Sequence, residues 1–414
     1  MLSGIAEHCP LTYVLRMSSL RDDFLRFISQ TSPEPMGVEV SASHGCILVD
    51  TSGKEYLDLL SGIGVTGIGH THPAAVQAIK AQAERYLHAM VYGEYIQKPQ
   101  VDLARRLAEI TPGDLSVTYF TNSGTEAVEG ALKTARKHTG RSGFVSFVGS
   151  FHGDTFGSVS VGGNSVYREP FEPLLPTITF LPFNDRNALQ AIDETVAGVI
   201  IEPIQGEGGV RIPDDDFLPA LRQRCTEVGA LLIFDEVITG FGRTGKLFAS
   251  EHWNVVPDIL LVAKALGGGM PLGAFISTPQ IMATLSHDPA LAHVTTFGGH
   301  PVCCAAGLAS LDVILQENLV LQAQEKGEEF VRKLRTLRGE GGCVAVRGRG
   351  LLIGIDFATP HITQRFVQEC FARGLILGWT LHEDTVVRLA PPLVISSQEI
   401  DRAVSIMRQV LGRL

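Results

Sequence analysis

Short apolar runs recur along the middle of the chain, and helical stretches separate many of them. We count seven such runs, near residues 117–120, 144–147, 178–181, 197–202, 230–235, 258–263 and 273–277. Alternation of buried strands with helices predicts a mostly parallel sheet with helices on its faces. The last two runs lie too close together for a helical crossover, so one strand is expected to be antiparallel.

The chain on either side of this pattern predicts a second, smaller α+β domain. Residues 1 to about 55 predict a helical arm followed by short strands, with apolar residues at helical spacing at Leu20, Phe24, Leu25 and Ile28. We find no internal repeat and no low-complexity linker, so the small domain is expected to combine both chain ends. The expected division is residues 1–60 for the arm and part of the small domain, 61–310 for the large domain and 311–414 for the rest of the small domain.

A lysine follows one of the buried runs at a glycine-rich turn. The run near 258–263 stops at Lys264, and Gly267, Gly268 and Gly269 come soon after it. Burial disfavours the charged form of an amine, so a lysine in this position is a candidate Schiff-base nucleophile. The alternative interpretation is a lysine at a strand end whose charged tip reaches solvent.

A second apolar run ends in a carboxylate, at Asp235. Pyridoxal phosphate needs a lysine for its aldehyde and an acid beside its ring nitrogen, because the protonated ring is the electron sink. Asp235 and Lys264 both fall at carboxyl ends of strands, where ligands of parallel sheets bind. The pair predicts a pyridoxal 5'-phosphate site, and Val237, two positions on, points the same way as Asp235 in extended chain. Taken alone, an aspartate here is also typical of a turn.

A third stretch predicts a phosphate cradle. A strand passes through Ser123, Gly124 and Thr125 into a helix. Backbone N–H groups, two hydroxyls and the positive end of the helix dipole then converge on one spot. The alternative is an ordinary helix start in which Ser123 and Glu126 form a capping box, and both interpretations can hold together.

Three further residues are candidates for binding a cofactor or a substrate. Phe151 follows the next strand and is placed to stack on a flat ring, with core packing as the alternative. Glu207, in a glycine-rich loop, is either a gate for charged substrates or a solvated loop acid. Arg388, between apolar residues and a Pro-Pro turn, suits a bidentate contact with a carboxylate or a structural ion pair.

Composition narrows the setting in which these residues work. The 414 residues are 45% hydrophobic and carry a formal net charge of −10, as expected of a soluble protein with a large core and no nucleic-acid partner. No apolar run approaches the roughly 18 residues of a membrane span, and the opening residues lack a basic region followed by an apolar block. The seven cysteines include no Cys-x-x-Cys, so we expect reduced thiols in the cytoplasm, and no metal site.

The chain resembles the class III aminotransferases of pyridoxal-phosphate fold type I. The resemblance extends from about residue 35 to 410 and rests on six motifs in a specific order and spacing. These motifs begin at Asn122, Phe151, Glu202, Asp235, Lys264 and Thr296.

The resemblance implies a role for each residue of the cofactor site. Lys264 corresponds to the Schiff-base and proton-shuttling lysine, and Asp235 to the partner of the pyridine nitrogen. Gly124 and Thr125 are expected to hold the phosphate with help from Ser123. Phe151 and Val237 are expected on the two faces of the ring, with His152 beside it.

The resemblance also implies a homodimer and a substrate switch. In the family, the threonine that matches Thr296 reaches the phosphate of the neighbouring subunit, so two active sites are shared. Arg388 matches an arginine that binds a substrate carboxylate, and Glu207 matches a glutamate that pairs with it when no carboxylate is bound. Such a switch lets one pocket accept both an amine and a 2-oxo acid.

Three positions depart from the pattern of the ornithine and acetylornithine members. Asp154 stands where those members usually have an arginine, and it either recruits a basic substrate or caps a turn. Ile238 stands where they tend to have glutamine. An isoleucine at this position resembles the ω-amino-acid and amine transaminases instead. His300 replaces the asparagine that is common at this position. The stretch that begins at Asn122, by contrast, resembles the ornithine group.

The resemblance implies transfer of an amino group to a 2-oxo acid by a ping-pong cycle. A donor amine displaces Lys264 from the cofactor aldehyde, the freed lysine moves a proton from the donor carbon to the cofactor, and a 2-oxo acid reverses the steps. The alternatives on the same fold are an aminomutase and a decarboxylating aminotransferase. A non-catalytic scaffold that retained the fold is the alternative from a different class.

Overall fold

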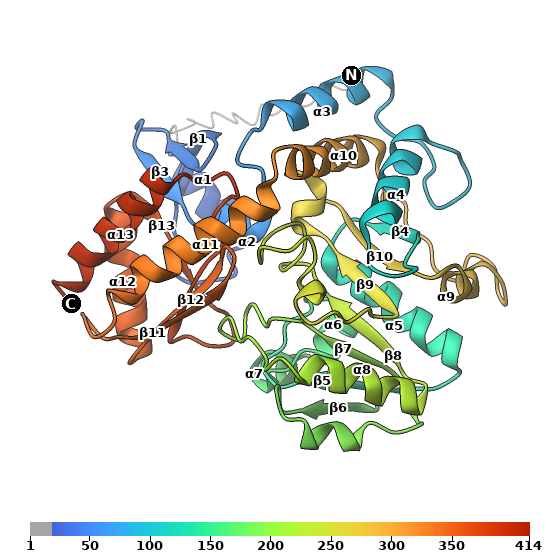
Figure 1. The fold of residues 1–414 in the computed structure, drawn as a ribbon. Coiled ribbons are helices and arrows are strands. Elements are labelled where there is room, and N and C mark those ends of the chain that lie inside the picture. Colours follow the sequence, from blue (N-terminus) through green and yellow to red (C-terminus); the bar gives the residue numbers. More distant parts are fainter. Residues whose placement is uncertain (1–18) are drawn as a thin grey trace, which may run out of the picture.

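A seven-stranded sheet forms the centre of the computed structural model, which describes residues 19–414 (Figure 1). Its strands lie in the order β4-β10-β9-β8-β7-β5-β6. All neighbours are parallel except β10, which is antiparallel to both β4 and β9. The strands are β4 (Val117–Thr121), β5 (Gly143–Phe147), β6 (Ile178–Leu181), β7 (Val196–Ile201), β8 (Leu231–Asp235), β9 (Ile259–Val262) and β10 (Gly273–Ser277).

Apolar side chains on both faces of the sheet explain why these strands read as continuous apolar runs. Every residue of β7, β8, β9 and β10 is buried. Along β8, Leu232 and Phe234 belong to one core cluster, whereas Leu231 and Ile233 belong to another. Because successive strand residues point to opposite faces, the sheet has a hydrophobic core on each side.

Helices from the same part of the chain cover the two faces of the sheet. The long helix α5 contributes Ala127, Val128 and Ala131 to the cluster that contains Ile233, and α8 contributes Phe217 and Leu221 to the other cluster. Figure 1 shows α8 in front of the sheet and α5 behind it. The helices of this region are α2 (Ser61–Gly64), α3 (Pro73–Arg85), α4 (Lys98–Ile110), α5 (Gly124–Thr139), α6 (Phe156–Ser160), α7 (Ser165–Arg168), α8 (Phe217–Val228), α9 (Pro279–Ala283) and α10 (Pro301–Gln316).

Two four-stranded sheets lie beside the central sheet, in the blue and red parts of Figure 1. One has the order β1-β2-β3-β13 and the other β11-β12-β15-β14. In the first, β3 pairs in parallel with β13, so a strand near the N-terminus shares a sheet with a strand near the C-terminus. The strands are β1 (Val40–His44), β2 (Ile47–Asp50), β3 (Glu55–Asp58), β11 (Cys343–Arg349), β12 (Leu352–Phe357), β13 (Leu375–Ile376), β14 (Gly378–Trp379) and β15 (Val386–Leu389).

Four helices accompany these smaller sheets. The helices α11 (Leu319–Arg335), α12 (Pro360–Ala372) and α13 (Ser397–Leu411) pack with them, while α1 (Leu20–Phe27) has no buried residue. Among the described residues no single helix is both long and apolar enough to cross a membrane. The consecutive helices α10 and α11 together reach that length and composition, with a bend of 65° between them.

The predicted sheet is confirmed, including its single antiparallel strand. The first 18 residues of the predicted arm lie outside the described residues, and the rest of the arm begins with α1. The sequence did not predict β1, because its residues are mostly exposed and its pattern is weak.

Candidate active site

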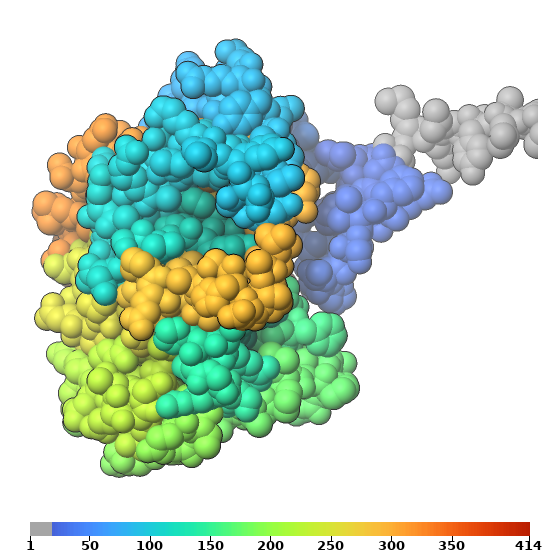
Figure 2. Space-filling view, turned by 90° about the vertical axis from the view of Figure 1, so that its right-hand side faces the viewer, coloured from blue at the N-terminus to red at the C-terminus, as the bar shows by residue number. Residues whose placement is uncertain are grey.

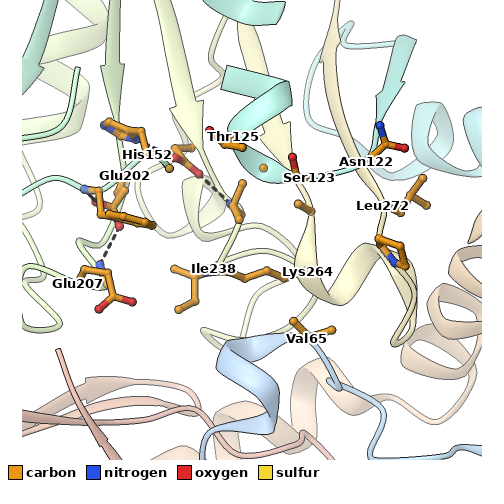
Figure 3. A pocket seen from close by; sticks show the side chains of 18 of the residues that line it. Val65, Asn122, Ser123, Thr125, His152, Glu202, Glu207, Ile238, Lys264 and Leu272 are labelled. Carbon is orange, nitrogen blue, oxygen red and sulfur yellow. Dashed lines mark hydrogen bonds and ion pairs between the residues drawn. The ribbon is translucent and has the colours of Figure 1, made fainter. Parts of the chain in front are cut away.

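The carboxyl ends of four neighbouring strands surround a cavity of about 460 Å³. The strands β5, β7, β8 and β9 end just before or at Phe151, Glu202, Asp235 and Lys264, and all four residues line the cavity. Figure 3 shows Ser123, Thr125 and His152 on one side of it, and Lys264, Ile238 and Val65 on the other. The sheet therefore brings together residues that are far apart in the sequence, as expected at this edge of a parallel sheet.

Lys264 has a strained backbone and a perturbed amine. It begins the short 3-10 helix η4 (Lys264–Gly267) with φ at +48°, a conformation that costs a non-glycine residue roughly 1–2 kcal/mol. Burial lowers the pKa of its amine, and the nearby Arg388 guanidinium lowers it further, against the opposing effect of Glu207 and Asp235. A larger share of neutral amine at physiological pH is what a nucleophile or a proton acceptor requires.

Asp235 and His152 form a buried pair beneath the cavity. The Oδ2 atom of Asp235 lies 2.7 Å from Nδ1 of His152, and its Oδ1 atom accepts the N–H of Val237 at 3.1 Å. These two contacts fix the plane of the carboxylate. The Nε2 atom of His152 is buried and has no hydrogen-bond partner among residues 19–414.

The predicted phosphate cradle is the N-terminus of α5. Ser123 caps the helix and accepts the N–H of Glu126 at 3.3 Å. The Glu126 carboxylate, however, accepts the N–H of Asn122 at 2.7 Å, so the capping box is incomplete. The N–H groups of Gly124 and Thr125 lie in the first turn, where a helix leaves its donors free for an anion.

Thr125 differs in one respect from its expected part in this cradle. Its hydroxyl lies 2.7 Å from that of Thr155 and 2.8 Å from that of Ser158, and it accepts the N–H of Thr155 at 3.2 Å. These contacts tie the start of α5 to the segment before α6. The backbone N–H of Thr125 is therefore the group better placed to meet a phosphate.

Phe151 and Val237 both line the cavity. A Cβ atom on Gly124 would lie 3.0 Å from both Cγ atoms of Val237, so glycine is needed for this close approach. Phe151 meets the ring of His382 edge-on, with 5.7 Å between the ring centroids. The cavity thus has one aromatic and one aliphatic wall, which suits a flat ring between them.

Glu207 and Arg388 form a buried ion pair at the edge of the cavity. The Nη1 atom of Arg388 contacts Oε1 of Glu207, and the two side chains are only 4% and 13% exposed. The other oxygen of Glu207 accepts the N–H of Leu381 at 2.9 Å, and its carbonyl accepts the N–H of His382 at 3.0 Å. Burial opposes the charge of this carboxylate, but Arg388 and the Leu381 N–H together hold its pKa below the ordinary value.

Three predicted residues lie differently with respect to this cavity. Thr296 is exposed and is not among the lining residues, and neither is Asp154, which is also exposed. His300 stacks on His88 with 5.5 Å between the ring centroids, away from the cavity. Ile238, in contrast, lines the cavity directly.

The chain matches the family model described as "Aminotransferase class-III" over residues 28–411. The chain belongs to the class-III aminotransferases. This membership agrees with the order of the six motifs and with the seven-stranded sheet. Pyridoxal phosphate is therefore the cofactor of this aminotransferase.

Relatives of this aminotransferase include a putrescine aminotransferase and an amine transaminase. Putrescine aminotransferase of Pectobacterium atrosepticum is 43% identical over 391 residues, which cover 91% of this chain and 83% of that protein. A transaminase from the marine bacterium Virgibacillus matches the fold with a TM-score of 0.90 at 27% identity, over 96% of this chain and 99% of that one. An amine transaminase from an uncultivated Pseudomonas species, solved in its pyridoxal-phosphate-bound form, matches with a TM-score of 0.86 at 29% identity, over 93% and 99% of the two chains.

The residues of the cavity fit this cofactor. His152 presents a buried nitrogen that has no hydrogen-bond partner in the described part of the chain. The first turn of α5 lies beside glycines whose side-chain positions are filled by neighbours. A Cβ atom on Gly153 would lie 2.4 Å from Cβ of Thr125, which shows how closely the backbone approaches here. Lys264 and Asp235 line the same cavity, as an aldehyde and a ring nitrogen require.

Glu202 lines the cavity, although the sequence predicted no role for it beyond the start of a motif. It follows β7 directly, is 4% exposed, and accepts two backbone N–H groups from different loops. A glutamate and a proline directly after a fully buried strand were the available signal. The signal did not distinguish Glu202 from Glu207, which lies in the same glycine-rich stretch.

Proposed function

We propose that this aminotransferase takes an amino group from a diamine or another ω-amine and passes it to a 2-oxo acid. The observation that carries the proposal is the ion pair between Glu207 and Arg388 in the cavity of Lys264. A donor without a carboxylate leaves this pair closed, and a 2-oxo acid offers Arg388 a carboxylate in place of Glu207. The 43% identity to a putrescine aminotransferase supports a diamine as the donor.

The residues around the cavity would divide the work as follows. Bound pyridoxal phosphate supplies an aldehyde that condenses with amines and a ring that acidifies the carbon bearing the amino group. Lys264 Nζ, with its lowered pKa, would accept that proton and return it in the second half of the cycle. Asp235 would hold the ring nitrogen in its protonated form, and His152 would keep the carboxylate in place through the 2.7 Å contact.

The remaining contacts would fix the cofactor. The N–H groups of Gly124 and Thr125, with the Ser123 hydroxyl, would hold the phosphate at the positive end of α5. Phe151 and Val237 would hold the ring from its two faces. These positions keep the reacting carbon within reach of Lys264, and positioning of this kind supplies a large part of the rate.

We also propose that the enzyme is a homodimer with shared active sites. Exposed apolar side chains in the segments 86–97 and 287–297 support a second copy as the partner; they include Leu87, Tyr95, Ile96, Leu291, Val294 and Phe297. In Figure 2 the amber segment that contains residues 287–297 crosses the face of the molecule below the blue and cyan residues of α3 and α4. Thr296 lies on this exposed segment, as its expected contact with the partner's phosphate requires.

Two further expectations remain proposals. The shared sheet of β3 and β13 supports a small domain built from residues 1–60 and 311–414, with residues 61–310 as the large domain. The six described cysteines are free and buried, which supports a reducing compartment such as the cytoplasm.

The decisive experiment follows the visible absorption band of the holoenzyme. Putrescine, 4-aminobutyrate, L-ornithine and L-glutamate are added separately without an acceptor. We expect putrescine to remove the band, 2-oxoglutarate or pyruvate to restore it, and no carbon dioxide to form. Loss of the band only with L-glutamate or L-ornithine would contradict a diamine donor, and multiple turnovers without any 2-oxo acid would indicate a mutase.

A matched pair of lysine variants tests the part of Lys264 in the same assay. Lys264→Ala should abolish the response to every donor. Lys326→Ala should retain it, because Lys326 also has a pKa lowered by burial but bonds to Gln322 and Leu393 outside the cavity. Full transfer activity in Lys264→Ala would refute the assignment.

A further inference from the structure

Glu202 bridges two loops that border opposite parts of the cavity. Its Oε1 atom accepts the N–H of Phe151 at 3.0 Å, and its Oε2 atom accepts the N–H of Gly206 at 2.8 Å. Phe151 belongs to the loop after β5, which forms the aromatic wall. Gly206 directly precedes Glu207, whose carboxylate meets Arg388. One buried carboxylate therefore joins the loop of Phe151 to the loop of Glu207.

Nothing else in the described part of the chain holds these two N–H groups together. Glu202 makes no ion pair among residues 19–414, and both of its oxygens are used by the two loops. Burial raises its pKa to about 7; the charges of His152 and the two N–H groups oppose this effect, and Asp235 adds to it. A buried acid that makes no ion pair among the described residues implies a task that an apolar side chain could not perform.

We propose that Glu202 is a positioning residue that couples the loop of Phe151 to the loop of Glu207. Through this coupling, Glu207 would leave and rejoin Arg388 while the Phe151 loop keeps its place beside the cofactor. The proposal rests on the function proposed above for Glu207 and Arg388. Glu202 fixes the position that Glu207 occupies when it pairs with Arg388 and to which it goes back after each acceptor step. Arg388 binds either Glu207 or the substrate carboxylate.

A second contact joins the same two loops beside the one that Glu202 makes. Gln205 donates its Nε2 hydrogen to the carbonyl of Val148 at 3.0 Å, and its backbone pairs with Arg211 on both sides at 3.1 Å. The loop thus stays attached when Glu202 is changed. A Cβ atom on Gly206 would lie 3.2 Å from Cγ2 of Ile238 and 3.5 Å from Oε2 of Glu202, so a glycine allows the loop to pass close to both side chains.

The position of Glu207 depends less on Glu202 when Glu207 is paired with Arg388 than when it is released from it. In the closed state Glu207 keeps its contacts with Arg388, Leu381 N–H and His382 N–H. When a 2-oxo acid takes Arg388, the first of these contacts is lost and the Gly206 anchor carries more of the restraint. Weakening that anchor should therefore impair the 2-oxo acid half-reaction more than the diamine half-reaction.

The test compares Glu202→Gln with the control Glu236→Gln. A glutamine has one accepting oxygen, so it can hold only one of the two N–H groups. Glu236 is a buried glutamate with a pKa raised to about 7, but it bonds to Thr239, Ala249 and Ser250 rather than to the loops of Phe151 and Gly206. The single-turnover kcat/KM is measured for putrescine and for 2-oxoglutarate separately, and amide hydrogen exchange is measured in the cofactor-free protein.

In Glu202→Gln we expect faster exchange in the segments 149–154 and 203–209, and a fall in kcat/KM about tenfold greater for 2-oxoglutarate than for putrescine. Glu236→Gln should leave both the ratio and these segments unchanged. Equal losses for the two substrates, or unchanged exchange, would overturn the coupling. If Glu202→Gln does not fold, Glu202→Asp takes its place, because its shorter side chain keeps the charge but cannot span both N–H groups. Failure of the function proposed for Glu207 and Arg388 is recognised separately. In that case Arg388→Gln would leave the ratio of kcat/KM for putrescine and 2-oxoglutarate unchanged.

Discussion

Replacing Arg388 with glutamine should separate the two halves of the reaction. Arg388 lies in β15, is 4% exposed and pairs with Glu207, so its guanidinium is largely shielded from solvent. Glutamine removes the charge but leaves a donor for Glu207, which limits damage to the fold. A diamine places no carboxylate near residue 388, whereas every 2-oxo acid does. The donor half-reaction should therefore survive the change and the acceptor half-reaction should not.

The size of the effect follows from the bonds that are lost. A hydrogen bond between charged groups contributes roughly 1.5–3 kcal/mol, and an arginine can make two of them to one carboxylate. A neutral amide recovers about 1 kcal/mol, so the net loss for a 2-oxo acid is about 3 kcal/mol. Each 1.36 kcal/mol is a factor of ten in rate, which predicts a fall of about 100-fold in kcat/KM for 2-oxoglutarate. For putrescine we expect a much smaller loss, which comes from the higher pKa of Lys264 once the Arg388 charge is removed.

The assay is single-turnover absorbance of the holoenzyme with each substrate alone. Arg211→Gln is the matched control, since Arg211 also pairs with a glutamate, Glu383 at 3.3 Å, but is 46% exposed and lies outside the cavity. It should leave both half-reactions unchanged. An equal loss for putrescine and 2-oxoglutarate in Arg388→Gln would refute the reasoning, because the arginine would then act on the cofactor or the fold rather than on a carboxylate.

Two further predictions concern stability. Gly130→Ala should lower the melting temperature through overpacking worth about 1–3 kcal/mol, because its Cβ atom would lie 2.2 Å from the ring of Phe275. The control Gly412→Ala, whose Cβ atom would lie 3.6 Å from its nearest neighbour, should be tolerated. Equal melting temperatures for the two variants would count against tight packing of α5 on the sheet. Glu236 has a pKa raised to about 7 in the folded state, so the folded protein binds the extra proton and loses stability as pH rises from about 4.5 to about 7. Glu236→Gln should flatten that part of the melting-temperature profile, and an unchanged profile would show that Glu236 does not titrate there.

The central sheet was predictable because its strands are buried on both faces. The runs near 144–147 and 197–202 correspond to β5 and β7 within about a residue, and Lys264 and Asp235 follow from the positions at which such runs stop. The antiparallel strand β10 followed from chain length alone, since no helix fits between it and β9. These features depend on local pattern, which a single sequence contains.

What the sequence could not supply were contacts between distant segments. The Thr125 hydroxyl is occupied by Thr155 and Ser158, some thirty positions away, and no local pattern indicates this. Glu202 and Glu207 follow the same strand, and only the fold shows that one meets backbone N–H groups and the other meets Arg388. The exposed strand β1 is stabilised by pairing with β2 rather than by burial, so its pattern is weak.

The pairing of the two chain ends also sets an order of assembly during synthesis. Ser61 donates its hydroxyl hydrogen to the carbonyl of Ala390 at 2.6 Å, across 329 positions of sequence. At roughly 5–20 residues per second, the ribosome needs about 15 to 65 s to make that stretch. Lys264 and the start of α5 emerge well before Arg388, so an interrupted translation product would carry the lysine and the proposed phosphate loop without the arginine proposed to bind a 2-oxo acid. Under the proposed function, the residues that bind the amine are synthesised before the arginine that binds the 2-oxo acid.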